Sequence, residues 1–433
     1  MTTTATEVSS LTGLPHWETL PDDIPAAIVQ IKRAIRERIA AQGRTIEQVI
    51  AEVEEFLAGE IADIQATRAR GEEVWPVIAY ADIEAGTVSA ATLAQIKRRG
   101  CAVIRGHFER SQAEQWDRDI VEYVDSNHFF ENYAGPADDF FGTLGTEASK
   151  PEIYPIYWSR AQMEARQHPR MATAQAFLNS QWTSESEGRS WFDPDQDTLY
   201  PDRIRRRPPG ASSGGLGTHL DPGTLDLWMT EGYQQHFRHL FAGDFAAYDP
   251  WDAAYRTEAA QYPGSTMCSA FRTFQGWTAL SDMPNDQGVL HTVPITRAMA
   301  YLMLRPLLSD VAEDDMCSVQ PNRTFPVNER YHAILLEAVS AIPSVKPGDS
   351  VWWHCDMIHS VAPVKDQQGW GNVMYIPSAP ECRKNNSYSA LVREAFVAGN
   401  SPYDFPPEHY EASWPNRFSV GDLNETGRRG LGL

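Results

Sequence analysis

The sequence predicts an α+β protein in which a helical arm precedes a body built around β-strands. Up to about residue 64 the apolar residues recur at helical spacing, whereas from Thr92 onward short apolar segments alternate with turns and shorter helices. The chain has 433 residues, of which 42% are hydrophobic, and is therefore long enough for a large core. We expect an arm over residues 1–90, a main domain over residues 91–420 and a tail over residues 421–433.

The arm is predicted from two apolar stripes. The first stripe contains Ile28, Ile31, Ile35 and Ile39. Gly43 can end this helix, and Thr45 with Gln48 three residues later has the pattern of a capping box that starts the next one. The second stripe continues to about Ile64. We expect the arm to pack on the body, and a coiled coil is the alternative.

The body is predicted to begin with a helix at Leu93 to Arg98, followed by a buried strand at Cys101 to Arg105. Ser111 with Glu114 is expected to cap the next helix. Strands are also predicted at Ala270 to Leu280, Gly288 to Pro294, Val345 to His359 and Asn372 to Ile376. These segments are apolar and are separated by turn residues.

Residues 193–217 are rich in Pro, Gly, Ser, Arg and Asp, and this composition predicts loops. Within them lies a basic run, Arg203-Ile204-Arg205-Arg206-Arg207, in a chain whose formal net charge is −21. Two interpretations remain open. The run is either a solvated strand or loop, or a wall of a pocket that binds an anionic ligand.

Charge and cysteine content limit the partners. The negative charge disfavours a nucleic-acid or anionic membrane surface. The five cysteines are scattered without a CxxC pair, which indicates free thiols in a reducing compartment. The sequence contains neither a signal-peptide pattern nor an apolar run of membrane-spanning length. We expect a cytoplasmic protein that binds a small-molecule substrate, no nucleic acid and no membrane, and its oligomeric state is left open.

The clearest chemical signal is Gly214 to Gly223, which reads GGLGTHLDPG. His219 and Asp221 are two residues apart, so in a strand both point to the same face. An imidazole beside a carboxylate provides two of the three ligands of the facial triad that holds non-haem Fe(II). This tripeptide is a weak signal alone, because His107-Phe108-Glu109 and His354-Cys355-Asp356 have the same pattern.

The third ligand is expected in the segment WWHCDMIHSVAP. If this segment is one continuous strand, His354 and His359 point to opposite faces, so only one of them faces the interior. A Gly348-Asp349 turn, a strand and then a histidine before a small residue resembles the distal-ligand layout of double-stranded β-helix oxygenases. This layout favours His219, Asp221 and His359 as the metal ligands, with His354 in place of His359 as the alternative.

The surrounding residues resemble the Fe(II)/2-oxoglutarate-dependent oxygenases of the phytanoyl-CoA-hydroxylase type, at Gly276 to Asp282 and Asp286 to Pro294. More closely, the chain resembles the YbiU-like branch of these oxygenases. That resemblance rests on Tyr157-Trp158-Ser159, Pro208-Pro209-Gly210, Phe271 to Trp277, Trp352 to Pro363 and Trp370 to Pro377. It implies a double-stranded β-helix core, also called jelly-roll or cupin-like, that is flanked by helices.

The resemblance also implies an enzyme that uses Fe(II), 2-oxoglutarate as cosubstrate and O2. Oxidative decarboxylation would give succinate, CO2 and a ferryl-oxo species that takes hydrogen from the substrate. We expect hydroxylation of a small polar metabolite, with no catalytic residue beyond the metal ligands; desaturation stays open, and Asp221 argues against halogenation. Two alternatives remain: a metal-dependent cupin-type dioxygenase or isomerase that does not use 2-oxoglutarate, and a non-catalytic jelly-roll that binds a metal or ligand.

One departure from the oxygenase pattern concerns the far carboxylate of 2-oxoglutarate. The family carries an Arg on its last core strand for this group, but the chain reads Gly369-Trp370-Gly371-Asn372 there. A buried carboxylate needs a cation or several donors. Arg272 is the first candidate for this role and Arg305 is the second.

Four aromatic residues are candidate walls of the substrate pocket: Trp228, Trp277, Trp353 and Tyr375. Because aromatic side chains also fill cores, a purely structural role stays open for each.

Overall fold

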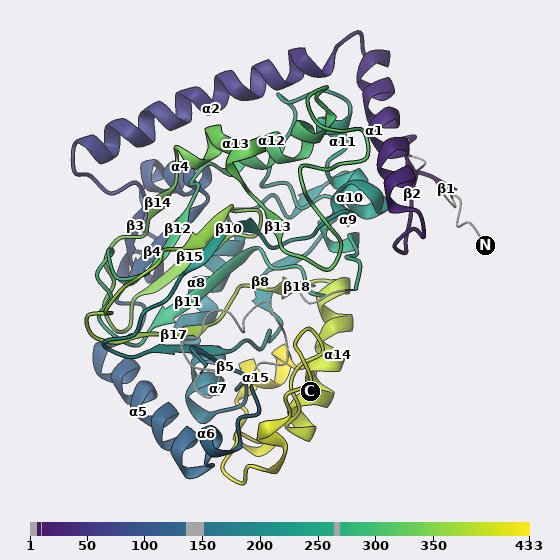
Figure 1. Ribbon diagram of the computed structural model, residues 1–433. Coiled ribbons are helices and arrows are strands. Elements are labelled where there is room, and N and C mark those ends of the chain that lie inside the picture. The colour runs from purple at the N-terminus through teal and green to yellow at the C-terminus, as the bar shows by residue number, and fades with distance from the viewer. Residues whose placement is uncertain (1–6, 10, 136–150, 264–268) are drawn as a thin grey trace.

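The computed structural model describes residues 7–9, 11–135, 151–263 and 269–433, and combines helices with several β-sheets (Figure 1). Helices α1 (Ile24–Ala41) and α2 (Ile46–Ala69) lie at one end of the molecule, and the C-terminal segment lies at the other (Figure 1). Two large sheets lie between them. In the described part of the chain these sheets share no strand, so they do not close into one barrel. The predicted mixture of N-terminal helices and a strand-rich body is confirmed.

The larger sheet has seven strands. In spatial order they are β3 (Val77–Ala79), β4 (Cys101–Arg105), β15 (Ser350–His354), β11 (Phe274–Ala279), β17 (Gly371–Tyr375), β9 (Ile204–Arg207) and β5 (Ile153–Tyr154). Only the β3–β4 pair among them is parallel. The strands β4, β15, β11 and β17 are buried on both faces, which fits their nearly continuous apolar sequences.

The smaller sheet has five antiparallel strands. In spatial order they are β13 (Phe325–Pro326), β10 (Leu216–Leu220), β16 (His359–Val361), β12 (Leu290–Thr292) and β14 (Ser340–Ala341). Three two-stranded sheets complete the strands: β1 (Glu7–Val8) with β2 (Pro15–His16), β6 (Glu185–Ser186) with β7 (Arg189–Ser190), and β8 (Asp193–Asp197) with β18 (Pro380–Glu381).

The other α-helices are short, except α5 and α14. They are α3 (Tyr80–Glu84), α4 (Ala90–Arg99), α5 (Arg110–Ser126), α6 (Phe129–Asn132), α7 (Arg160–Arg166), α8 (Pro169–Asn179), α9 (Asp226–Met229), α10 (Glu231–His236), α11 (Arg238–Phe241), α12 (Met299–Leu304), α13 (Glu329–Leu336), α14 (Arg383–Ala398) and α15 (Glu425–Gly430). The 3-10 helices are η1 (Arg256–Glu258), η2 (Thr296–Ala298), η3 (Arg305–Leu307), η4 (Tyr410–Ser413) and η5 (Val420–Asp422). None of the described helices combines the length and apolar composition that crossing a membrane would need.

Side chains alternate across the large sheet, and each face has its own core. Ile104, Phe274 and Trp352 belong to a core shared with α5, α7 and α8. Their neighbours Val103 and Val351 belong to a second core, which also contains Leu290 of the small sheet. We call the region between the two sheets the inter-sheet space. Strand parity decides which residues face it.

The N-terminal arm packs on the body, as predicted. Thr45 and Gln48 form the expected capping box at the start of α2. Ile31 of α1 and Leu57 of α2 are fully buried in a core that also contains Leu220 of β10 and Ile358, the residue before β16. The helices are therefore stabilised by the same apolar cluster that supports two strands of the small sheet.

Two local predictions were wrong. Helix α5 begins at Arg110 after Glu109, and no side chain caps it, so Ser111 lies inside the first turn. Residues 193–217 contain strands β8 and β9 and the first part of β10, where loops were expected. All four residues of β9 are buried, and the solvated interpretation of the basic run is therefore also wrong. The loop prediction failed because it treated the arginines of this segment as exposed residues, whereas those of β9 are buried in a strand.

The segment Val345 to His359 is not one strand. Strand β15 ends at His354 in the large sheet, the chain turns, and β16 begins at His359 in the small sheet. His354 and His359 therefore lie in different sheets, and strand parity does not relate them. Cys101, Cys317 and Cys382 are free thiols, as predicted, and are buried, as is Cys355; Cys268 lies outside the described residues.

Replacing Ile31 by Ala tests whether the arm shares the main core. The side chain is fully buried, so the change should lower the free energy of unfolding by about 2–5 kcal/mol. Val29 lies on the same helix and is 39% exposed, and Val29→Ala should change it by less than about 0.5 kcal/mol. Urea denaturation followed by tryptophan fluorescence measures both. Equal effects of the two substitutions would contradict the shared core.

Candidate metal centre

His219, Asp221 and His359 come together at adjacent strands of the small sheet. His219 lies on β10, Asp221 follows the end of that strand, and His359 is the first residue of β16. The two strands pair antiparallel, with His219 directly opposite His359. Cross-strand partners project to the same face, and the two imidazole rings lie 4.2 Å apart between centroids. Main-chain pairing thus sets the separation of the two histidines.

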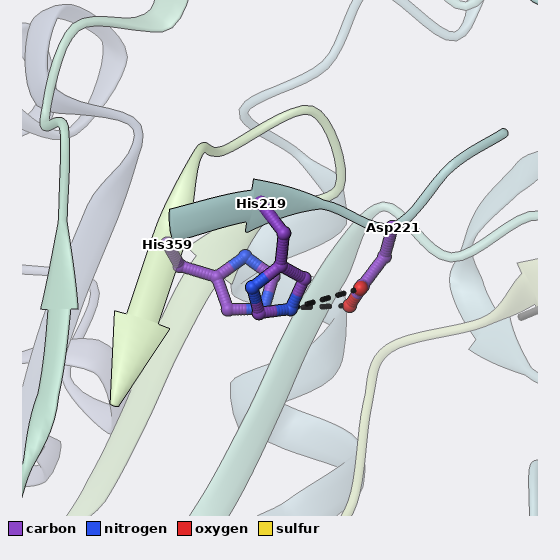
Figure 2. A group of neighbouring side chains, drawn as sticks. All are labelled: His219, Asp221 and His359. Atoms are coloured by element: carbon purple, nitrogen blue, oxygen red, sulfur yellow. Dashed lines mark ion pairs between the residues drawn. The ribbon is translucent and has the colours of Figure 1, made fainter. Parts of the chain in front are cut away.

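The Asp221 carboxylate bridges the two imidazoles (Figure 2). Its Oδ1 lies 3.4 Å from His219 Nε2, and its Oδ2 lies 3.4 Å from His359 Nε2. One ligand atom from each residue lies within 4.8 Å of the other two. The Asp221 side chain is 27% exposed, compared with 6% and 7% for the histidines, so the cluster is open to solvent on the carboxylate side.

Backbone carbonyls fix the orientation of both rings. The Nδ1 of His219 lies 2.7 Å from the carbonyl oxygen of Gly217, and the Nδ1 of His359 lies 2.9 Å from that of Met357. A carbonyl oxygen only accepts, so each Nδ1 carries a hydrogen and donates it. In the neutral ring the lone pair is then on Nε2, which faces the carboxylate. Metal-binding histidines are held in this way, and two nitrogens with one carboxylate fit the ligand set of a facial triad.

Burial disfavours the charged form of all three side chains. Interactions among them determine whether each pKa still shifts in the direction that burial favours. Burial would raise the pKa of Asp221, but the neighbouring imidazoles hold it well below its usual range. Burial would lower the pKa of His219, but the hydrogen bond and negative charge of Asp221 raise it above its ordinary value. For His359, burial lowers the pKa to about 4. Without a metal, Asp221 is therefore ionised, and of the two histidines it is His219, whose pKa is raised, that takes up a proton more readily.

The competing His354-Cys355-Asp356 group also has close ligand atoms, but its polar atoms have other partners. His354 Nε2 lies 3.1 Å from the carbonyl oxygen of Pro250, and its Nδ1 accepts a hydrogen bond from the Asp356 backbone N–H. Asp356 forms a buried ion pair with Arg256. The polar atoms of this group therefore make hydrogen bonds and an ion pair within the protein. His354 lies in the large sheet, and His359 is the histidine that joins His219 and Asp221.

His107 of the other competing tripeptide is also structural. Its Nδ1 lies 2.8 Å from Ser350 Oγ and its Nε2 lies 3.1 Å from the carbonyl oxygen of Arg170. Burial lowers the pKa of His107 to about 3, so the ring is neutral.

The two candidate anchors for a carboxylate lie in different surroundings. Arg272 precedes β11, and its positive charge acts on both Asp221 and His359. Arg305 starts η3, donates to both carboxylate oxygens of Asp310 and also to the carbonyl oxygen of Tyr331. The Arg305 guanidinium is already neutralised, so it does not offer a cation to a ligand. The structure therefore brings Arg272, but not Arg305, to the electrostatic surroundings of the cluster.

Three of the four candidate aromatic residues face the inter-sheet space. Trp353 lies beside His359, with 5.6 Å between ring centroids. Trp277 and Tyr375 are cross-strand partners, and both pack with the inter-sheet core. Trp228 instead belongs to the core shared with the N-terminal helices, where its Nε1 donates to the carbonyl oxygen of Met303. Trp228 therefore lies in that core and not in the inter-sheet space.

A set of buried hydrogen-bond donors lies near the histidines and was not predicted from the sequence. Thr292 lies opposite His359 in register, and Gln275 lies opposite Trp353. Within the described residues, Thr292 Oγ1, Gln275 Nε2 and Trp353 Nε1 have no hydrogen-bond partner in the protein. Buried donors normally have acceptors, so the inter-sheet space suits a ligand with several oxygen atoms. Only strand register, which the sequence does not give, could have found these residues.

Comparison with known proteins places the chain among uncharacterised relatives. The Gig2-like family matches residues 22–433. The uncharacterised protein YbiU of Escherichia coli strain K12 is 56% identical over 418 residues, which cover 96% of this chain and 98% of that protein. The predicted similarity to YbiU is thereby confirmed.

Two crystal structures extend this likeness to the fold. A Salmonella typhimurium LT2 protein that carries the provisional name oxidoreductase has a TM-score of 0.92 and 54% identity, covering 96% of this chain and 99% of that one. The GlcNAc Inducible Gene 2 protein of Candida albicans has a TM-score of 0.75 at 24% identity, covering 97% of this chain and 90% of that one. The latter likeness shows a common fold alone.

If the cluster holds a metal, removing any of its three side chains should weaken Fe(II) binding. We expect His219→Ala, Asp221→Ala and His359→Ala each to raise the dissociation constant at least about 100-fold, because changes outside the ligand set already cost 10- to 100-fold. Anaerobic titration calorimetry measures this. His291 lies on the neighbouring strand β12 and provides the matched control, His291→Ala. Unchanged binding in the three ligand variants would refute the site.

The pH dependence of metal binding follows from the proton on His219. This proton must leave before Nε2 binds a cation, so the affinity should rise about tenfold per pH unit below the His219 pKa and level off above it. His359 is neutral near pH 7 because its pKa is about 4. At a pH below the His219 pKa, calorimetry in buffers of different ionisation enthalpy should count one proton released per metal ion. Release of two protons would contradict this charge assignment.

Proposed function

The chain belongs to the Gig2-like family, and we propose that it is an Fe(II)/2-oxoglutarate-dependent oxygenase that hydroxylates a small polar metabolite. The observation that carries the proposal is the convergence of His219 Nε2, His359 Nε2 and the Asp221 carboxylate at neighbouring strands. Family membership leaves the activity open, so the proposal depends on this site. The provisional oxidoreductase name of the Salmonella relative is consistent with it.

The strand order supports a double-stranded β-helix as the underlying fold. Strands β9, β11, β15 and β17 belong to the large sheet, whereas β10, β12, β14 and β16 belong to the small one. Along the chain, β9 to β12 and β14 to β17 alternate between the two sheets. We assign these eight strands to the double-stranded β-helix, with β3, β4, β5 and β13 as additions at its edges. The two candidate histidine ligands then lie on the neighbouring strands β10 and β16 of the smaller sheet, and Asp221 directly follows β10.

Fe(II) bound to the three side chains would supply the centre at which O2 and a 2-oxo acid react, with succinate and CO2 as products. The chain itself provides orientation and charge. The Nδ1–H bonds to the carbonyl oxygens of Gly217 and Met357 keep both Nε2 atoms aimed at one point. Asp221 contributes one negative charge, and three ligands on one face leave the other positions open to small molecules. Trp353 packs beside His359, with 5.6 Å between the ring centroids.

The main competing function is a cupin-type dioxygenase or isomerase that does not use 2-oxoglutarate. It is favoured by one observation, which is that β17 carries no cationic side chain. A metal-binding module without activity is less consistent with the cluster, because the carboxylate edge is open to solvent.

Anaerobic optical titration separates these functions. With Fe(II) and 2-oxoglutarate together, the wild-type protein should develop a metal-to-ligand charge-transfer band that neither component gives alone. His219→Ala should lose the band, because the ligand set is incomplete. Bound Fe(II) without a band on adding 2-oxoglutarate would favour the cupin-type alternative. Succinate release, measured across amino acids, nucleosides, sugars and organic acids, then identifies the substrate class.

A further inference from the structure

We infer that Arg205 binds a carboxylate group in the inter-sheet space, and that this group is the distal carboxylate of the 2-oxo acid. The inference rests on the proposed function, because it assigns the cosubstrate's far end. The inference also accounts for the lack of a cationic side chain on β17, because the Arg205 guanidinium comes from β9, the neighbouring strand.

The orientation of Arg205 follows from strand parity. On β9, Ile204 belongs to the core on the outer face of the large sheet, and Arg206 pairs with Asp117 of α5 on that same side. Arg205 alternates with them and lies opposite Val373 of β17 in register. Val373 packs in the inter-sheet core. Arg205 therefore faces the inter-sheet space, as does Arg207 two residues later.

The guanidinium of Arg205 lies where a side chain of β17 would otherwise project. A Cβ atom built on Gly371 would lie 3.9 Å from Arg205 Nη2 and 3.7 Å from Gln367 Nε2. Gly371 lies in the segment where the oxygenase resemblance expects an arginine. Gly371 itself projects no side chain there, and Arg205 brings a positive charge to this part of the inner face from the adjacent strand.

Arg205 differs from its neighbours in charge compensation. Arg203 lies 3.8 Å from Asp202, Arg206 lies 3.1 Å from Asp117, and Arg207 lies 3.2 Å from Glu152, measured between nitrogen and carboxylate oxygen. Thus three of the four arginines have a carboxylate partner.

No carboxylate of the described residues lies within ion-pair distance of Arg205. Its Nη2 lies 3.8 Å from the sulfur of Met283, which is a weak acceptor, and its Nε has no hydrogen-bond partner among these residues. The residue is only 8% exposed. A buried guanidinium without a counter-charge is costly, and a bidentate carboxylate is its preferred partner.

Rows of inward-facing residues connect the metal cluster with Arg205. Trp353, beside His359, pairs with Gln275 of β11; the next row is Trp277 with Tyr375, and the following row is Val373 with Arg205. A 2-oxo acid with a second carboxylate has oxygen atoms at both ends and an apolar middle. The inter-sheet space offers the same order of groups. The candidate metal ligands and buried donors lie at one end, aromatic rings lie in the middle, and the Arg205 guanidinium lies at the other end.

Two ligands and one substitution test the assignment. 2-Oxopentanoate has the carbon chain of 2-oxoglutarate without the distal carboxylate. With Fe(II)-loaded protein under anaerobic conditions, Arg205→Met should raise the dissociation constant for 2-oxoglutarate about 10- to 100-fold, the value of a charge-assisted pair. The constant for 2-oxopentanoate should change less than about twofold. Calorimetry reads both without turnover.

Two further variants keep the test independent of folding. Arg205→Lys retains the charge without the bidentate geometry and should recover part of the preference for 2-oxoglutarate. Arg206→Lys lies on the same strand but faces α5, so its ratio of the two constants should equal that of the wild type. If Arg205→Met keeps the wild-type ratio, the Arg205 assignment is wrong although the proposed function stands. If the wild-type protein binds neither 2-oxo acid, the proposed function fails and the assignment fails with it.

Discussion

The pairing of β10 with β16 is the constraint on which the candidate site depends. It sets His219 opposite His359, and the carboxylate that follows β10 then lies between the two Nε2 atoms. A slip of one residue in this register would turn one histidine to the other face of the sheet. The register is irregular between Leu216 and His219, which indicates a local bulge just before the ligand. Such bulges often reorient side chains beside functional sites.

Most of the buried charged side chains in this part of the protein are compensated by nearby groups. The acidic protein buries the arginines of the run Arg203 to Arg207, and a nearby carboxylate pairs with each of them except Arg205. At the metal cluster, backbone carbonyls rather than charged residues orient the histidines. Neutral partners of this kind fix the tautomer without adding further negative charge. Positive charge is therefore left uncompensated at one point only within this group of residues.

The parts of the structure that depend on local patterns could be predicted from the sequence. The α1 and α2 helices and the Thr45–Gln48 cap follow from spacing along one stretch of chain. The cluster was found by combining a two-residue spacing with a resemblance, although the assumed continuity of Val345 to His359 was wrong. Strand β9 was missed because a strand's neighbours decide whether arginines are buried, and no local pattern contains those neighbours. Thr292 and Gln275 were missed for the same reason, since only register brings them near His359.

The N-terminal helices have a consequence for how independently the parts of this protein can vary. Leu220 lies between His219 and Asp221 in the sequence and Ile358 precedes His359, and both Leu220 and Ile358 are buried in a core that also contains Ile31 and Leu57. The backbone that carries the candidate ligands is thus supported from behind by residues more than 160 positions earlier in the chain. The arm is therefore unsuited to being lost or exchanged as a module. Packing ties its sequence to the strands that carry the candidate metal ligands, although none of its described side chains belongs to the cluster.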